Sequence, residues 1–149
     1  MLMLAARLWF WAAVVRPLKH VVPLATLVRL AHRGTSPGAS RRGAVHQLQA
    51  FLQRTGRAPA RAPANCLERS LGAYHVLCAA GAAPEIVVGI RRGAGDRVDG
   101  HVWVTLGGYP LAEDESFLAT FARVLTFDAS GRQMPGTADR VPDGVRLMS

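Results

Sequence analysis

Residues 65–81 read NCLERSLGAYHVLCAAG, and residues 84–114 read PEIVVGIRRGAGDRVDGHVWVTLGGYPLAED. The first stretch begins with Asn65, a residue type that favours the position just before a helix. Its apolar residues then recur every three or four positions, which is the spacing of one helix face. This stripe consists of Leu67, Leu71, Tyr74 and Leu77. The pattern predicts a helix that starts near Cys66 and ends near Gly81.

The second stretch contains two runs of β-branched residues, 83–92 and 98–106, which predict two consecutive strands. Gly107 and Gly108 after the second run are typical of a hairpin turn into a further short strand. Residues 117–125 fit either an amphipathic helix or a passage from helix to strand. We therefore expect an α+β fold in which one helix packs on a small antiparallel sheet.

Cys66 stands in the first turn of the expected helix. The macrodipole and the unpaired backbone N–H groups of a helix N-terminus favour a thiolate over a thiol. The same N–H groups can hold the oxyanion that forms when a thiolate attacks a carbonyl carbon. A cysteine at a helix start is more often only structural, so its position becomes informative only together with a base.

A candidate base, His101, lies on the second expected strand, on one face with Trp103 and Thr105. Glu113 and Asp114 follow directly after the expected hairpin. A carboxylate there could accept the imidazole N–H and orient the ring, which completes a set of nucleophile, base and orienting acid. Because neighbouring residues of a strand face opposite ways, only one of the two carboxylates should face His101.

Cys66 and Cys78 are the two cysteines of the chain, twelve positions apart. In one helix they would lie about 18 Å apart along the axis. Cα atoms joined by a disulfide lie about 4.4–6.8 Å apart, so these two cannot be bridged. We expect a reducing compartment, and Cys78 as an inert core residue.

The 18 basic and 10 acidic residues of this 149-residue chain give a net charge of +8. Residues 1–67 hold ten Arg and Lys and no acid, whereas residues 68–149 hold eight basic and ten acidic residues. This distribution excludes a uniformly basic nucleic-acid coat and indicates a basic front segment on a near-neutral domain. We expect Arg69 on a solvated helix face, with a pair to Glu68 or an acidic partner as alternatives. Arg91 and Arg92 should end a strand at the surface.

Residues 1–15 read MLMLAARLWFWAAVV, and Arg7 interrupts this apolar run. The run is shorter than the roughly 20 apolar residues of a spanning helix. Its charge follows the apolar residues, whereas a secretory signal carries charge before them. Residues 1–15 and 20–30 both predict amphipathic helices. These helices either pack on the domain or a partner, or lie on an anionic membrane surface.

The chain divides into three expected parts. Residues 1–43 form a hydrophobic, basic helical extension that ends in a turn-rich linker. Residues 44–128 form the core and begin with a short amphipathic helix at 44–54. Residues 129–149 form a flexible tail. We expect a cytoplasmic protein, with membrane association as an alternative.

Three sequence blocks occur in one order: CLERSL at 66–71, IVVGIRR at 86–92 and GHVWV at 100–104. In order and spacing they resemble the leader peptidases of lasso-peptide biosynthesis, which carry a C-L-x-R-[SA]-L helix, an I-G-V/I-R strand and an [AG]-H-[AV]-W-V strand. The resemblance covers about residues 63–127. It implies a papain-like or transglutaminase-like core, in which a helix carrying Cys packs on a small antiparallel sheet carrying His and Asp or Glu.

By position, the resemblance places the family's nucleophile on Cys66 and its general base on His101. The family usually has Asp about twelve residues after the histidine, where this chain has Glu113 with Asp114 next. Residue type favours Asp114 as the third member, and Glu113 stays an alternative. Asn65 and Trp103 are two further candidates for substrate contact. The alternative role is helix capping for Asn65 and core packing for Trp103.

The resemblance implies a thiol protease that removes the leader from a ribosomally made precursor peptide. An asparagine-synthetase-like cyclase would then close the macrolactam of the freed core with ATP. A small leader-recognition protein would hold the precursor, and the N-terminal helices with Arg29 and Arg33 are a candidate docking face for it. The candidate catalytic residues require no metal and no cofactor, and we expect no nucleic-acid partner. A transglutaminase-like acyl transferase or amidase, or a non-catalytic adaptor, stays open.

Overall fold

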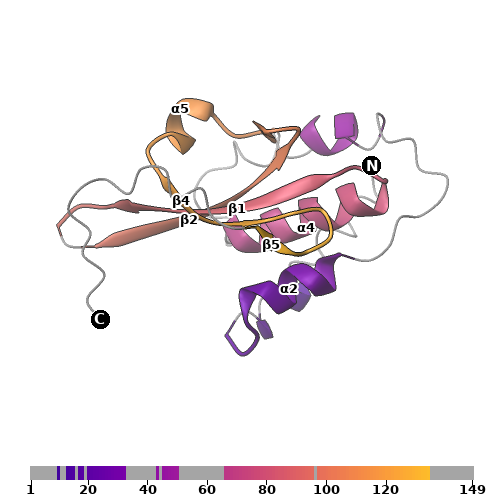
Figure 1. Cartoon of the computed structure of the whole chain (residues 1–149), viewed down its shortest axis with the longest axis horizontal. Coiled ribbons are helices and arrows are strands. Elements are labelled where there is room, and N and C mark those ends of the chain that lie inside the picture. The colour runs from indigo at the N-terminus through magenta and orange to yellow at the C-terminus, as the bar shows by residue number, and fades with distance from the viewer. Residues whose placement is uncertain are drawn as a thin grey trace.

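The computed structural model describes residues 10, 13–15, 17–18, 20–32, 43, 45–50, 66–95 and 97–134 (Figure 1). In chain order its elements are α2 (Leu24–Ala31), α4 (Cys66–Ala79), β1 (Pro84–Arg92), β2 (Val98–Leu106), β3 (Tyr109–Pro110), α5 (Glu115–Leu118), β4 (Ala122–Phe127) and β5 (Gln133–Met134). Residues 45–50 are also helical. The fold is α+β, as the sequence predicts.

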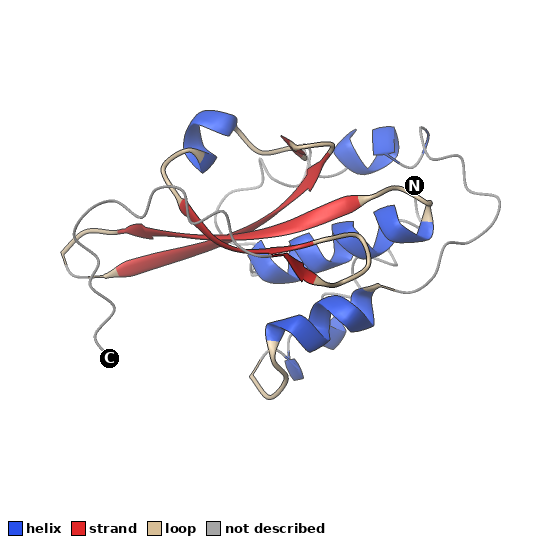
Figure 2. Cartoon of the chain, in the orientation of Figure 1, coloured by secondary structure: helices blue, strands red, loops and turns tan. Residues whose placement is uncertain are grey.

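One five-stranded antiparallel sheet forms the centre, in the order β3-β2-β1-β4-β5. β1 pairs with β2 on one side and with β4 on the other, and Gly89 lies opposite both His101 and Arg123. The helices lie on both faces of this sheet (Figure 2). In space the order is α5, the sheet, α4 and then α2 (Figure 1).

The main core lies between α4 and the sheet. Side chains of α4 pack there against every second residue of β1 and β2, because strand side chains alternate between faces. The buried members of this cluster include Leu71, Tyr74, Leu77, Ile86, Val102, Val104 and Phe127. α4 is buried on almost every side, since the sheet covers one face and α2 covers another.

α2 belongs to the same core and not to a separate unit. Leu27, Val28 and Ala31 are buried in the cluster that contains α4. His75 Nδ1 of α4 lies 2.8 Å from the backbone oxygen of Ala31, the distance of a hydrogen bond. The apolar residues of α2 are therefore used inside the domain, as one of the two alternatives for the N-terminal segment predicts. No helix among the described residues is long and apolar enough to cross a bilayer.

The sheet also extends beyond the part that the sequence patterns define. Gln133 and Met134, which we assigned to the flexible tail, pair with β4 as its edge strand β5. The turn before β5 contains Gly131 at φ +74°, and a Cβ there would lie 3.3 Å from the Cα of Arg29 in α2. The first residues of the expected tail are thus part of the domain, and residues 135–149 lie outside the described residues.

A second, smaller cluster covers the opposite face of the sheet. It consists of Val87, Trp103, Leu118 and Phe121, and α5 and the turn after it lie over it. Gly89 lies directly beneath these rings: a Cβ there would be 2.8 Å from Cη2 and Cζ3 of Trp103 and 2.9 Å from Cβ of Phe121. Such distances are closer than van der Waals contact, so only glycine fits at this position.

Replacing Gly89 by alanine should lower the free energy of unfolding by about 1–3 kcal/mol, because Trp103 and Phe121 cannot both keep their places. Gly100→Ala is the matched control, since Gly100 lies in the neighbouring strand and a Cβ there meets nothing within 4 Å. Urea unfolding of the two variants measures the difference. Equal stability would contradict the close packing over Gly89.

Candidate active site

The start of α4 is fixed against β2 close to His101. The Ser70 hydroxyl donates a buried hydrogen bond of 2.9 Å to the backbone oxygen of Val102, the residue after His101. After α4 the chain enters β1 at Pro84, which pairs with Leu106 at the other end of β2. α4 therefore runs from the level of Val102 towards that of Leu106, with its N-terminus directed to the β1–β2 turn.

Cys66 is the first residue of α4 and is partly exposed. Residues three and four positions apart in a helix share one face, so Cys66 lies on the face of Arg69 and Ser70. One helical turn is about 5.4 Å. Cys66 is thus one turn beyond the Ser70 contact with β2, and it packs against the core cluster on the α4 face of the sheet.

His101 and Glu113 form a close pair. His101 Nε2 and Glu113 Oε2 are 2.6 Å apart, and each side chain is 15% exposed. An ionised carboxylate can only accept, so the imidazole Nε2–H donates this hydrogen bond. In the neutral ring Nδ1 is then the acceptor. Glu113 does not contact Nδ1, so this nitrogen is the one that can exchange a proton with a thiol.

A left-handed residue precedes Glu113 in the chain. Leu111 is still bound to the sheet, because its N–H donates to the backbone oxygen of Val104 at 2.9 Å. Ala112 then adopts φ +60°, a conformation that costs a residue with a side chain about 1–2 kcal/mol. The chain turns there, and Glu113 follows as the carboxylate that faces His101. Such backbone strain is typical of functional sites.

The sequence position of Arg69 predicts a solvated helix face, but the structure places its side chain against Glu113. Its Nη2 lies 3.1 Å from Oε1 of Glu113, and its side chain is 35% exposed. Each oxygen of Glu113 therefore has its own partner, Arg69 on α4 and His101 on β2. Sequence reasoning missed this residue, although its place one turn after Cys66 is the signal that could have indicated it.

Asp114 has a different role from Glu113. Its carboxylate caps α5 and accepts hydrogen bonds from the Ser116 N–H at 2.8 Å, from the Phe117 N–H at 3.2 Å and from the Ser116 hydroxyl. These bonds, the Ser116 hydroxyl first, lower the pKa of Asp114. The preference for Asp114 as the partner of the imidazole was wrong, because the chain starts a helix at this residue instead of continuing a strand.

Aromatic rings surround the imidazole of His101. Trp103 stacks at 6.0 Å between ring centroids, and Phe117 and Phe121 each lie at 5.4 Å. Trp103 is 1% exposed, and its Nε1 has no hydrogen-bond partner among the described residues. The structure thus places Trp103 in the core beside the candidate base. Asn65, the other residue expected to contact substrate, lies outside the described residues.

Cys78 lies away from this arrangement. It is buried near the end of α4, its Sγ is 3.8 Å from the backbone oxygen of Ala129, and neither cysteine is in a disulfide. Burial raises the pKa of the Cys78 thiol to about 11. The expectation of an inert core thiol fits this environment. Cys66, at the other end of α4, is one helical turn from the Ser70 contact with the strand that carries His101.

The described residues thus include a thiol at the start of α4 and, on β2, an imidazole whose Nε2 is held by a carboxylate. Where a thiol and such an imidazole are in contact, the imidazole can take the thiol proton, and the carboxylate fixes the tautomer that does so. The arrangement is suited to nucleophilic attack on a carbonyl carbon and to return of the proton to a leaving group.

Comparison with known proteins identifies a family for the chain. The family model described as the transglutaminase-like superfamily matches residues 9–126, which is more than half of the chain. The match includes α2, Cys66, His101 and Glu113. Searches of curated proteins and of solved structures found no match.

Iodoacetamide at about pH 8 should alkylate Cys66 and spare Cys78 in the folded protein. With a pKa of about 11, only about one Cys78 thiol in a thousand is ionised at that pH, and the side chain is buried as well. Peptide mass spectrometry identifies the labelled cysteine. The control is Cys66→Ser, which should take up label only after urea unfolding. Labelling of Cys78 in the folded protein would contradict the environment described for it.

Proposed function

The chain belongs to the transglutaminase-like superfamily, whose members are typically Cys-His-Asp proteases and acyl transferases, and on that premise we propose that it is a cysteine peptidase. We propose further that its substrate is a ribosomally made lasso-peptide precursor, from which it removes the leader. The observation that supports catalysis best is the contact of 2.6 Å between His101 Nε2 and Glu113 Oε2. His101 lies on β2, the strand that α4 contacts through Ser70.

In the proposed reaction, Nδ1 of His101 takes the proton of the Cys66 thiol as the sulfur attacks the carbonyl carbon of the last leader residue. The carbon–nitrogen bond then breaks, and His101 returns the proton to the leaving amine of the core peptide. A water molecule, deprotonated by the same nitrogen, releases the leader from the thioester and restores the thiol. N–H groups of the first turn of α4 are suited to stabilise the oxyanion in both steps.

Glu113 and Arg69 have supporting roles in this proposal. Glu113 stabilises the imidazolium that forms when His101 takes the proton, as the acidic member of such triads does. Arg69 holds the second oxygen of Glu113 and so limits rotation of the carboxylate. The pair joins the helix with the nucleophile to the strand with the base.

The choice of substrate depends on the three sequence blocks. The three blocks lie on α4, β1 and β2, and the first and third of these elements carry Cys66 and His101. Their agreement in order and spacing with lasso-peptide leader peptidases supports a precursor peptide as substrate. We also propose a small leader-recognition protein and an asparagine-synthetase-like cyclase as partners. Arg29 on α2 is exposed and lies on the proposed docking face for the recognition protein.

Glu113→Gln should lower kcat/KM by about 100-fold, because the neutral amide stabilises the imidazolium less and loses its ion pair with Arg69. Asp114→Asn is the matched control: it changes the adjacent carboxylate, which caps α5, and should leave kcat/KM close to the wild-type value. Steady-state kinetics on both variants, with circular dichroism to verify folding, gives the comparison. A larger loss in Asp114→Asn than in Glu113→Gln would assign the third role to Asp114.

Incubation of the protein with a lasso-type precursor peptide and a leader-recognition protein should produce free leader and free core, as measured by mass spectrometry. Cys66→Ala should form neither product, because the thioester cannot form. A leader carrying an added amine instead of a free carboxylate would identify the acyl-transferase alternative. Equal activity of Cys66→Ala and the wild type would exclude cysteine catalysis.

A further inference from the structure

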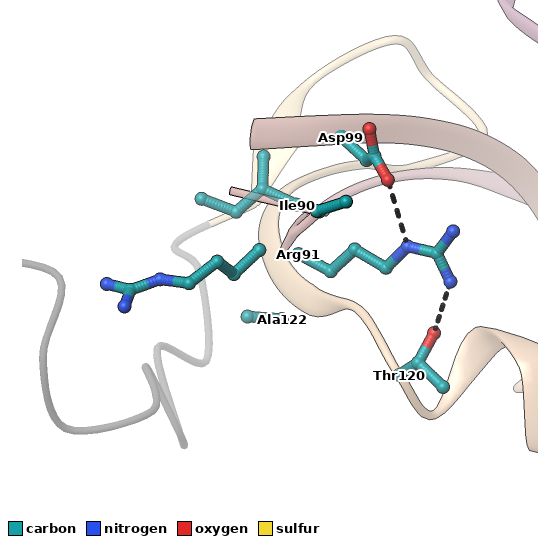
Figure 3. A pocket seen from close by; sticks show the side chains of 8 residues that line it. Ile90, Arg91, Asp99, Thr120 and Ala122 are labelled. Atoms are coloured by element: carbon teal, nitrogen blue, oxygen red, sulfur yellow. Dashed lines mark hydrogen bonds and ion pairs between the residues drawn. The ribbon is translucent and has the colours of Figure 1, made fainter. Parts of the chain in front are cut away.

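A cavity of about 440 Å³ lies at the far end of the β1–β2 hairpin. β4 begins at Ala122, which pairs with Ile90 of β1. The cavity opens beyond this pair, where β1 continues without β4 beside it. Arg91, Asp99 and Thr120 line it together with Ile90 and Ala122 (Figure 3). The cavity is more open than enclosed, which suits a side chain of a bound peptide better than a whole small molecule.

Arg91 makes several contacts at the wall of this cavity. Its Nε lies 3.4 Å from Oδ2 of Asp99, and its Nη1 donates to Oγ1 of Thr120 at 3.3 Å (Figure 3). The Cζ atom also lies 4.6 Å from the ring centroid of Phe121 and 5.4 Å from that of Phe117. These contacts reduce the entropy that a flexible arginine loses when it binds a ligand.

The guanidinium still has capacity for an anion. It has five N–H donors, and the contacts to Asp99 and Thr120 use two of them among the described residues. Both contacts are long, and the side chains of Arg91 and Asp99 are 35% and 49% exposed. Ion pairs of this kind add little stability, so a ligand carboxylate can replace Asp99 at small cost.

The cavity is next to the candidate active site. The ring of Phe121 lies between the two, 4.6 Å from the Arg91 guanidinium and 5.4 Å from the imidazole of His101. Asp99 and His101 are two residues apart on one face of β2. The N-terminus of α4 with Cys66 is also directed to this end of the hairpin. An extended peptide advances about 3.3 Å per residue, so a side chain a few residues from the scissile bond can reach the cavity.

We propose that this cavity binds an acidic side chain of the substrate peptide, through paired hydrogen bonds from Arg91 to its carboxylate. The proposal rests on the peptide-cleaving function proposed above and adds a specificity pocket to it. The N–H donors of Arg91 that remain beside its contacts to Asp99 and Thr120 favour an anionic ligand. Asp99 acts as an internal competitor that occupies Arg91 until the substrate carboxylate replaces it.

The first test measures selectivity with a positional-scanning library of decapeptides, quantified by mass spectrometry. The wild type should prefer Glu over Gln by about tenfold in kcat/KM at one position near the cleaved bond. In Arg91→Gln this ratio should fall to about one, and in Asp99→Asn it should rise above the wild-type value. Because the ratio is taken within each variant, a general loss of activity in Arg91→Gln does not affect it.

Arg123→Gln is the matched control. Arg123 also lies beside the aromatic cluster, with its Cζ 6.0 Å from the ring centroid of Trp103, but it does not line the cavity. Its Glu-to-Gln ratio should equal that of the wild type. An unchanged ratio in Arg91→Gln, or cleavage without preference for Glu at any position, would overturn the proposal.

A second test does not depend on cleavage. N-acetyl-glutamate amide should shift the NMR signals of the Arg91 Nε–H and the Thr120 amide, whereas N-acetyl-glutamine amide should not. The shifts should disappear in Arg91→Gln and persist in Arg123→Gln. If these shifts occur in a protein that cleaves no peptide, the pocket stands and the peptidase proposal fails. Equal shifts with both compounds, or none with either, would overturn the pocket whether or not the protein cleaves peptides.

Discussion

The carboxylate of Glu113 joins the two halves of the candidate site. One of its oxygens lies 3.1 Å from Arg69 on α4 and the other lies 2.6 Å from His101 on β2. The Ser70 hydroxyl adds a second bond between the same two elements, at the backbone oxygen of Val102. The position of the first turn of α4, and therefore of Cys66, relative to the imidazole follows from these contacts. A site that needs precise distances is thus supported by a helix and a strand, which are more rigid than loops.

The sheet separates the core that stabilises the fold from the rings that surround the base. Val102 and Val104 face α4, whereas His101 and Trp103 face α5. The second face can hold large rings close to the backbone because Gly89 has no side chain beneath them. Low polarity around His101 strengthens its hydrogen bond to Glu113, since hydrogen bonds are stronger away from water. One glycine in the central strand is therefore a condition for the environment of the imidazole.

Local patterns were sufficient for the elements that carry the site. Helical spacing and β-branched runs predicted α4 and the hairpin of β1 and β2, and β2 has the predicted bounds 98–106. The patterns failed where a residue depends on a distant partner. Arg69 has a polar side chain that looks solvated in the sequence, but its partner is 44 positions away. β5 has two residues, too few for an alternating pattern, and it is defined by its pairing with β4.

The sequence patterns could not decide whether Glu113 or Asp114 faces His101. The rule that neighbours face opposite ways holds in a strand, but β3 ends at Pro110 and Ala112 has a left-handed backbone. The two carboxylates are then divided between two structures: Glu113 is mostly buried and faces the site, and Asp114 is exposed and caps α5. The two oxygens of the Glu113 carboxylate contact Arg69 and His101 separately. The left-handed residue at 112 and the helix cap at 114 therefore decide which of the two carboxylates faces His101.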